Sequence, residues 1–137
     1  MLAYKVAMLA SDLSESLSKE YASYQLSMPQ WRILATLGAL HENSPHSALT
    51  AKDIAVATRL DKVQVSRALE RLVSKDIVHR RVSDSDKRAT LISLSSEGER
   101  IYRTLLPKIV RWQNKRLENI TDDEYQIFLK VIDTLKP

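Results

Sequence analysis

The chain has 137 residues, of which 44% are apolar and 28% charged, proportions typical of a single globular domain. It contains no cysteine, which excludes disulfide bonds, thiolate metal sites and cysteine nucleophiles. The formal net charge is +4, and the absence of a run of ~18–20 apolar residues argues against a membrane-spanning helix.

The first part of the chain is predicted to form two helices. Apolar residues recur at steps of three and four over residues 2–21, which is the period of an amphipathic helix. After a break, Ser27 is placed to cap a second helix with Pro29 in its first turn, where the missing N–H of proline costs nothing. This second helix is expected to end in a loop at residues 41–46.

A pair of short helices is predicted next. Thr50 is placed to cap a helix over residues 51–57, and residues 58–60 turn the chain. Asp61 then caps a helix over residues 62–75. Two helices joined by so short a turn are typical of a helix-turn-helix unit.

After this pair the hydrophobic period changes to alternation. Residues 77–82 and 90–94 are predicted as two strands joined by residues 83–88. Ser95 is placed to cap a long helix, and Thr121 opens the last helix with a capping box. The order predicts a mainly α protein with a small β-hairpin wing, a winged helix-turn-helix flanked by N- and C-terminal dimerisation helices.

The second helix of the pair carries the candidate DNA-reading residues. Its apolar stripe consists of Val65, Leu69, Leu72 and Val73. The polar face opposite suits the major groove, because Gln and Arg form bidentate bonds with base edges. The residues expected on this outward face are Lys62, Gln64, Ser66, Arg67, Ala68 and Arg71. Residues 50–94 also carry ten Lys and Arg against six Asp and Glu, an excess that suits a polyanion. Each feature alone also fits an ordinary solvated face.

The end of the predicted hairpin, residues 80–88, is basic. Lys87 and Arg88 near its tip are expected to reach an adjacent minor groove, whose negative potential attracts arginine. Asp86 lies two residues before Arg88, and we expect it to hold the Arg88 guanidinium in a carboxylate–guanidinium fork. The alternative is a polar loop with nearby opposite charges.

Two apolar helical segments lie toward the ends of the chain, at residues 2–21 and 99–136. A winged helix does not need them to complete its core, so we expect them to pair between two copies rather than to pack on their own copy. Such a dimer would set two recognition helices about 34 Å apart, one turn of DNA. We expect a single domain over residues 1–137, with a dimerisation module at residues 1–24 and 99–137 and a DNA-binding lobe at residues 28–98.

Several motifs resemble one family of regulators. Residues 49–58 and 61–72 are similar to the helix-turn-helix of MarR/SlyA-type transcription regulators. Residues 86–94, Asp-Lys-Arg-Ala-Thr-Leu-Ile-Ser-Leu, resemble the wing of that family, and Ser95-Ser-Glu-Gly98 resembles the start of its long dimer helix. The similarity extends over residues 25–135.

The resemblance implies a homodimer that binds a pseudo-palindromic operator on double-stranded DNA, usually as a repressor and often released by a small aromatic or anionic ligand. It implies base reading by Ser66 and Arg67, and a place near bases or phosphates for Gln64 and Arg71. Arg88 would be the wing arginine in the minor groove.

Two departures from the family bear on this expectation. Ser83-Asp84 stands where Asp-Pro is frequent in the family, so the path of the wing loop is open. The absence of cysteine removes the thiol-sensing members as a guide to regulation.

An effector is expected in a cleft between the dimer module and the DNA-binding lobe. A ligand there would act through its different affinities for two separations of the lobes. The residues expected to line the cleft, each of which also suits a core or surface position, are Tyr21, Tyr24, Trp31, Arg32 and His41. His41 and His46, with Glu42 between them, lack a third ligand at metal spacing, so no metal and no cofactor are expected.

Two other functions remain as alternatives. A winged helix used for protein–protein assembly would expose apolar residues on its second helix, where this chain has mostly lysine, glutamine and arginine. An enzyme would need a glycine-rich phosphate loop, a His-x-x-x-His pair or a Ser/His/acid grouping, and since the sequence has none, no catalytic activity is expected. The N-terminus lacks the long apolar centre of a signal peptide, and the expected location is the cytoplasm.

Overall fold

The computed structural model describes residues 1–137 and confirms the predicted order of elements. The elements are α1 (Leu2–Tyr21), a 3₁₀ turn η1 (Ala22–Tyr24), α2 (Met28–Asn43), α3 (Ala51–Thr58), α4 (Lys62–Ser74), β1 (Val78–Val82), β2 (Thr90–Leu94), α5 (Ser96–Leu117) and α6 (Asp122–Leu135). The protein is a mainly helical winged helix-turn-helix with one antiparallel hairpin, as the sequence predicts.

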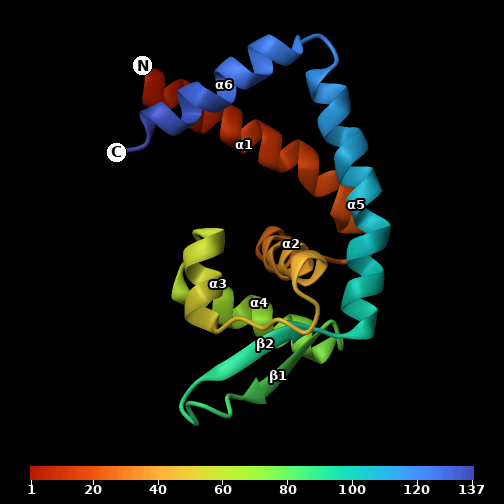
Figure 1. Ribbon diagram of the computed structural model, residues 1–137. Helices are drawn as coiled ribbons and strands as arrows, with labels where there is room; N and C mark the ends of the chain where they lie inside the picture. Colours follow the sequence, from red (N-terminus) through yellow and green to blue (C-terminus); the bar gives the residue numbers. More distant parts are fainter.

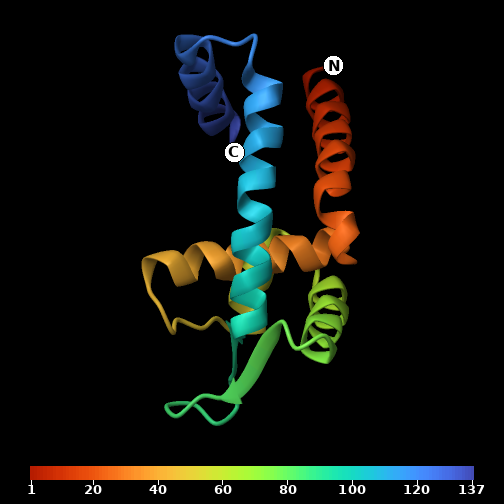
Figure 2. The ribbon, with the colours of Figure 1, turned by 90° about the vertical axis from the view of Figure 1, so that its right-hand side faces the viewer.

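The elements divide into a lobe and a helical end (Figure 1). Helices α2, α3 and α4 pack on one another, and the hairpin lies against them. Figure 2 shows α5 running from the hairpin past the lobe and on beside α1, with α6 turned back at the end of the molecule farthest from the hairpin. The two chain termini lie at that same end.

Helix starts are fixed by side-chain caps. Ser27, Thr50, Asp61 and Thr121 each accept a hydrogen bond from a backbone N–H three residues ahead and complete a capping box. Ser95 caps α5 in the same way, by accepting from the Gly98 N–H at 2.9 Å. These bonds satisfy N–H groups that have no partner inside the helix, and all five caps agree with the sequence-based prediction.

Some boundaries differ from the prediction. Helix α2 continues to Asn43, through the start of the loop expected at residues 41–46. Strand β1 begins at Val78 because the Ile77 N–H donates to the Leu72 carbonyl of α4 instead of joining the hairpin. The 3₁₀ turn at residues 22–24 is an addition to the predicted elements.

A third segment of the chain pairs with the hairpin, and the sequence does not predict this pairing. Val78 pairs with Leu94 at its base and Val82 with Thr90 at its tip. Leu49, just before α3, forms an isolated bridge with Ile92: their backbone amides and carbonyls exchange hydrogen bonds of 2.9 and 2.7 Å. The bridge ties the wing to the start of the helix-turn-helix.

The core fills the lobe and extends to the first half of α5, which buries Ile101, Tyr102 and Leu105. It is one cluster of 18 buried apolar residues, and its most enclosed members include Ile33, Leu34, Ile54, Leu72, Ile92 and Leu105. The expectation that a winged helix completes its core without residues 99–136 is therefore wrong for this part of α5. Helix α6 contributes no buried residue, and α1 contributes only Tyr21 at its end. None of the helices combines the length and the apolar character that crossing a membrane requires.

Candidate nucleic-acid interface

Helix α4 presents a buried stripe and an exposed polar face. Its buried residues are Val65, Ala68, Leu69 and Leu72. The side chains of Lys62, Ser66, Arg67 and Arg71 are exposed, as the sequence predicts. The expectation that Ala68 lies on the outward face is wrong: at steps of three and four from Val65 and Leu72, it belongs to the packed stripe.

Gln64 is engaged in the helix cap. Its side-chain Oε1 accepts a hydrogen bond from the Asp61 N–H at 3.2 Å, while the Asp61 carboxylate accepts from the Gln64 N–H at 2.7 Å. Gln64 is half-buried in this arrangement. The amide nitrogen of its side chain remains as the group that can still donate to a base or a phosphate.

A buried threonine stabilises the turn before α4. Thr58 is buried, and its hydroxyl donates to the Ile54 carbonyl at 2.7 Å and accepts from the Leu60 N–H at 3.4 Å. Arg59 adopts a left-handed conformation with φ of 61°, which reverses the chain direction between α3 and α4. The exposed Arg59 side chain adds a cation beside the start of α4 that sequence reasoning missed.

Asp86 stabilises the wing loop through the backbone. Its Oδ1 accepts a hydrogen bond from the Arg88 N–H at 3.0 Å, whereas the Arg88 Nε lies 3.9 Å away. The two side chains form a loose ion pair instead of the predicted hydrogen-bonded fork, because at a spacing of two residues the carboxylate reaches the backbone amide first. The Arg88 side chain is 97% exposed and free to extend from the loop.

Ser83 fixes the path of the same loop. It is buried, and its hydroxyl accepts from the Asp86 N–H at 3.3 Å and bonds with the Ser85 hydroxyl at 3.1 Å. The Ser83 N–H in turn donates to the Ala89 carbonyl at 2.9 Å. The loop is thus closed by serine and aspartate side chains, which leaves Lys87 exposed together with Arg88.

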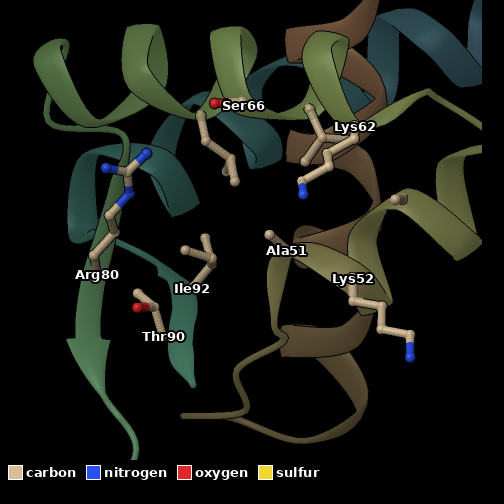
Figure 3. A pocket seen from close by; sticks show the side chains of 10 residues that line it. Ala51, Lys52, Lys62, Ser66, Arg80, Thr90 and Ile92 are labelled. Atoms are coloured by element: carbon tan, nitrogen blue, oxygen red, sulfur yellow. The ribbon is translucent and has the colours of Figure 1, made fainter. Parts of the chain in front are cut away.

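A hollow of about 600 Å³ opens between α3, α4 and the hairpin (Figure 3). Its walls include Val65 and Leu69 from α4 and Ile92 from β2. Lys62 and Arg80 border it on opposite sides, with Ser66 above it (Figure 3). This cationic border joins the exposed face of α4 to the wing. The sequence places Arg80 in the basic hairpin tip but does not single it out as a DNA contact.

Three of the five residues expected at an effector cleft come together. The Tyr21 and Trp31 rings stack with centroids 5.6 Å apart, and both residues line a hollow of about 230 Å³ with Arg32. Burial raises the pKa of the Tyr21 hydroxyl above its usual value, while Arg32 acts against this rise. Trp112 of α5 completes the wall and donates from Nε1 to the Ser16 hydroxyl at 2.9 Å.

The other two residues lie elsewhere. The Tyr24 hydroxyl accepts from Lys108 Nζ at 3.3 Å, and that ammonium lies over the Tyr24 ring. His41 contacts the Glu99 carboxylate near the start of α5 and lines different hollows from those of Tyr21 and Trp31. Tyr24 and His41 are thus tied to α5 rather than to the hollow beside Trp31.

Comparisons with known proteins agree with this architecture. The sequence model of the MarR family matches residues 24–89. The chain is 24% identical over 84 residues to the HTH-type transcriptional regulator BilQ of Clostridium symbiosum, a match that covers 61% of this chain and 58% of that protein. The chain thus matches less than two thirds of the length of this relative.

Solved structures share the fold over nearly the whole chain. A MarR/EmrR family regulator from Acinetobacter sp. ADP1 is 24% identical with a TM-score of 0.84, and the match covers 98% of this chain and 91% of that one. A mutant form of MarR from E. coli, complexed with operator DNA, is 20% identical with a TM-score of 0.80, covering 99% and 94%. These structures establish the fold of the present chain.

Proposed function

We propose that the protein is a transcription regulator that binds double-stranded DNA as a homodimer, on the premise that the sequence model of the MarR family matches residues 24–89. The exposed cationic and polar face of α4, continuous with the basic wing, carries the proposal. In this role Ser66 and Arg67 read base edges in the major groove, and Arg88 enters the adjacent minor groove. The similarly folded mutant MarR of E. coli, which is complexed with operator DNA, supports this assignment.

A second copy of the chain is the partner we propose for the helical end. The first half of α1 and one face of α6 expose large apolar side chains to solvent: Leu2, Tyr4, Val6, Met8, Leu9, Ile127, Phe128, Leu129, Val131, Ile132 and Leu135. These two segments lie at the same end of the molecule (Figures 1 and 2). Exposed apolar side chains in this number are typical of an interface. Residues 1–24 and 99–137 then form the dimer module, and residues 28–98 the DNA-binding lobe.

Two-fold symmetry gives the proposed operator its form. A symmetric dimer places two copies of α4 in successive major grooves about 34 Å apart, which requires a pseudo-palindromic site. Occupancy of such a site next to a promoter would block transcription, so we propose that the protein acts as a repressor.

Release by a small ligand is the third part of the proposal. The hollow lined by Tyr21, Trp31 and Arg32 lies where α1, α2 and α5 meet, between the dimer module and the lobe. Two stacked rings and a guanidinium suit a small aromatic anion. Such a ligand lowers DNA affinity if it binds better to the lobe separation that does not fit the operator. Titration with benzoate-class acids, measured by operator affinity in the parent and in Arg32→Gln, tests this part.

The alternative of a protein–protein module predicts an apolar docking face on α4. Val63 is the only large apolar residue that α4 exposes, and cationic and polar residues surround it. One valine is far smaller than the patches that mark protein interfaces. The observed face therefore favours DNA.

Selection of bound sequences from random duplex DNA tests the whole proposal. We expect enrichment of two related half-sites whose centres lie about one helical turn apart. Affinity for the selected duplex is expected to fall linearly on a log–log plot against salt concentration, because binding releases counterions from phosphates. A chain that stays monomeric and enriches no duplex at low salt contradicts the proposed function.

A further inference from the structure

Val63 is an exposed apolar residue at the start of α4 with no structural partner. Its side chain is 56% exposed, although it is the second residue of a helix that buries four others. It belongs neither to the core cluster nor to the half-buried apolar residues that pack against that cluster. Valine also has a lower helix propensity than alanine, so helix formation gives no reason for its presence.

The position of Val63 on α4 is central to the outward face. Successive residues of a helix are rotated by about 100°, so Val63 points within about 20° of the direction opposite to the middle of the buried stripe. Lys62 and Ser66 flank it on one side, and Arg67 and Arg71 on the other. The residues proposed to contact DNA thus surround a valine, which lies where the helix would enter the groove most deeply.

Because the Val63 side chain is apolar, few groups in the major groove can be its contact. Residues in the first turns of a recognition helix approach base edges. Valine has no hydrogen-bonding group, so it cannot read a donor or an acceptor or bind a phosphate. The edges of the base pairs in the major groove present one distinctive apolar group, the C5-methyl of thymine.

We propose that Val63 reads the C5-methyl group of one thymine in each half-site, an inference that rests on the proposed DNA binding. Lys62, Ser66 and Arg67 position the helix through polar contacts, and Val63 excludes water from the methyl group between them. The contact gives a preference for thymine over cytosine, adenine or guanine at that position without any hydrogen bond.

Replacement of thymine by deoxyuridine isolates this contact. Deoxyuridine keeps the pairing and every hydrogen-bonding group of thymine and lacks only the methyl group. In the duplex selected by the parent protein, each thymine is replaced in turn, at the symmetric positions of both half-sites. We expect one thymine at which the replacement weakens binding by about fourfold per half-site, the value of one buried methyl group.

The variant Val63→Ala then removes the protein side of the contact. Alanine favours the helix, so the variant is expected to fold and to bind the selected duplex more weakly. The affinity ratio between the thymine and deoxyuridine duplexes at the position found above should fall well below fourfold, because alanine lacks the two γ-methyl groups of valine. Val56→Ala is the matched control, because Val56 is a 71% exposed valine on α3, and this variant should keep the ratio of about fourfold.

The outcomes separate the two proposals. A Val63→Ala protein that keeps the full thymine preference, or a parent protein that is indifferent to deoxyuridine at every position, overturns the role of Val63 while DNA binding stands. A parent protein that enriches no duplex contradicts DNA binding itself and the inference with it.

Discussion

Lys75, the C-cap residue of α4, donates a hydrogen bond from Nζ to the side-chain Oε1 of Gln30 at 3.2 Å. The same ammonium donates to the Gln25 carbonyl at 2.5 Å, and Gln30 Oε1 also accepts from the Ser27 N–H at the start of α2. Gln25 has a left-handed φ of 59° at the bend between η1 and α2. One cation thus connects the proposed DNA-reading helix to the junction at which the proposed dimer module meets the lobe.

Lys75→Met tests this connection. Methionine keeps the aliphatic stem but cannot donate, so the free energy of unfolding is expected to fall by about 1–2 kcal/mol. We also expect the orientation of α4 relative to the dimer module to become looser. Operators with one base pair inserted between the half-sites should then lose less affinity in the variant than in the parent. Lys19→Met, which removes an exposed lysine of α1, is the control; an unchanged spacing preference in Lys75→Met contradicts the coupling.

Arg67→Ala is expected to cost about 1–3 kcal/mol of binding free energy on the selected operator. Because a bidentate contact to a base edge distinguishes that base from the others, the variant should also lose its preference at one position of each half-site. A repeat selection with the variant measures this directly. Arg71→Ala provides the comparison: loss of a phosphate contact weakens binding evenly across sequences and lowers the salt slope by about one. An unchanged selected motif with Arg67→Ala would exclude base reading by Arg67.

Much of the fold can be predicted from the sequence because helix caps and hydrophobic periods depend on neighbouring residues. Ser27, Thr50, Asp61, Ser95 and Thr121 act on N–H groups within three residues of themselves, so the sequence alone locates each helix start. The hydrophobic period likewise separates the helices from the hairpin because it depends only on local geometry.

Features that depend on contacts between residues far apart in the sequence cannot be predicted from local patterns. The Leu49–Ile92 bridge joins residues 43 positions apart, and no local pattern around Leu49 indicates a strand. His41 shares α2 with Trp31, which suggests a common cleft, but Glu99 of α5 determines where the His41 ring lies. Val63 is missed when only polar residues are considered as DNA contacts, although its place opposite the buried stripe follows from helix geometry.

Three variants distinguish the role of Asp86 in DNA binding from that of Arg88. Arg88→Ala should weaken binding to operators with A·T-rich flanks and leave the half-site preference intact, because a narrow minor groove attracts arginine. Asp86→Ala loses the bond to the Arg88 N–H and should be a milder copy of Arg88→Ala. Asp86→Asn retains an acceptor oxygen and should bind as tightly as the parent or more tightly, since it also loses a negative charge near phosphate. Tighter binding by Asp86→Ala would mean that the carboxylate repels DNA more than it orders the loop.

Gly38→Ala tests the close contact between α2 and α5 through the sign of its effect on the free energy of unfolding. At an open position inside a helix, this change stabilises a protein by about 0.5–1 kcal/mol. Here a Cβ on Gly38 would overlap the Tyr102 ring where α2 crosses α5, so we expect a loss of about 1–3 kcal/mol in denaturant unfolding. The double variant with Tyr102→Leu should recover part of that loss by vacating the ring's space. A stabilised single variant would show that α2 and α5 are not in close contact.

Phe128→Glu tests the proposed dimer through α6. Phe128 is 49% exposed within the apolar face of a helix that packs on no other element beyond isolated contacts. The lobe does not depend on this helix for its core, so the variant should remain folded by circular dichroism while sedimentation shows a monomer. A buried charge without a partner strongly opposes association, and loss of the second copy should sharply weaken binding to a two-half-site operator but not to a single half-site. Gln126→Glu adds the same charge on the polar side of α6 and should leave the dimer intact. If both variants stay dimeric, the copies associate through another surface, and the exposed apolar face of α6 needs a different partner.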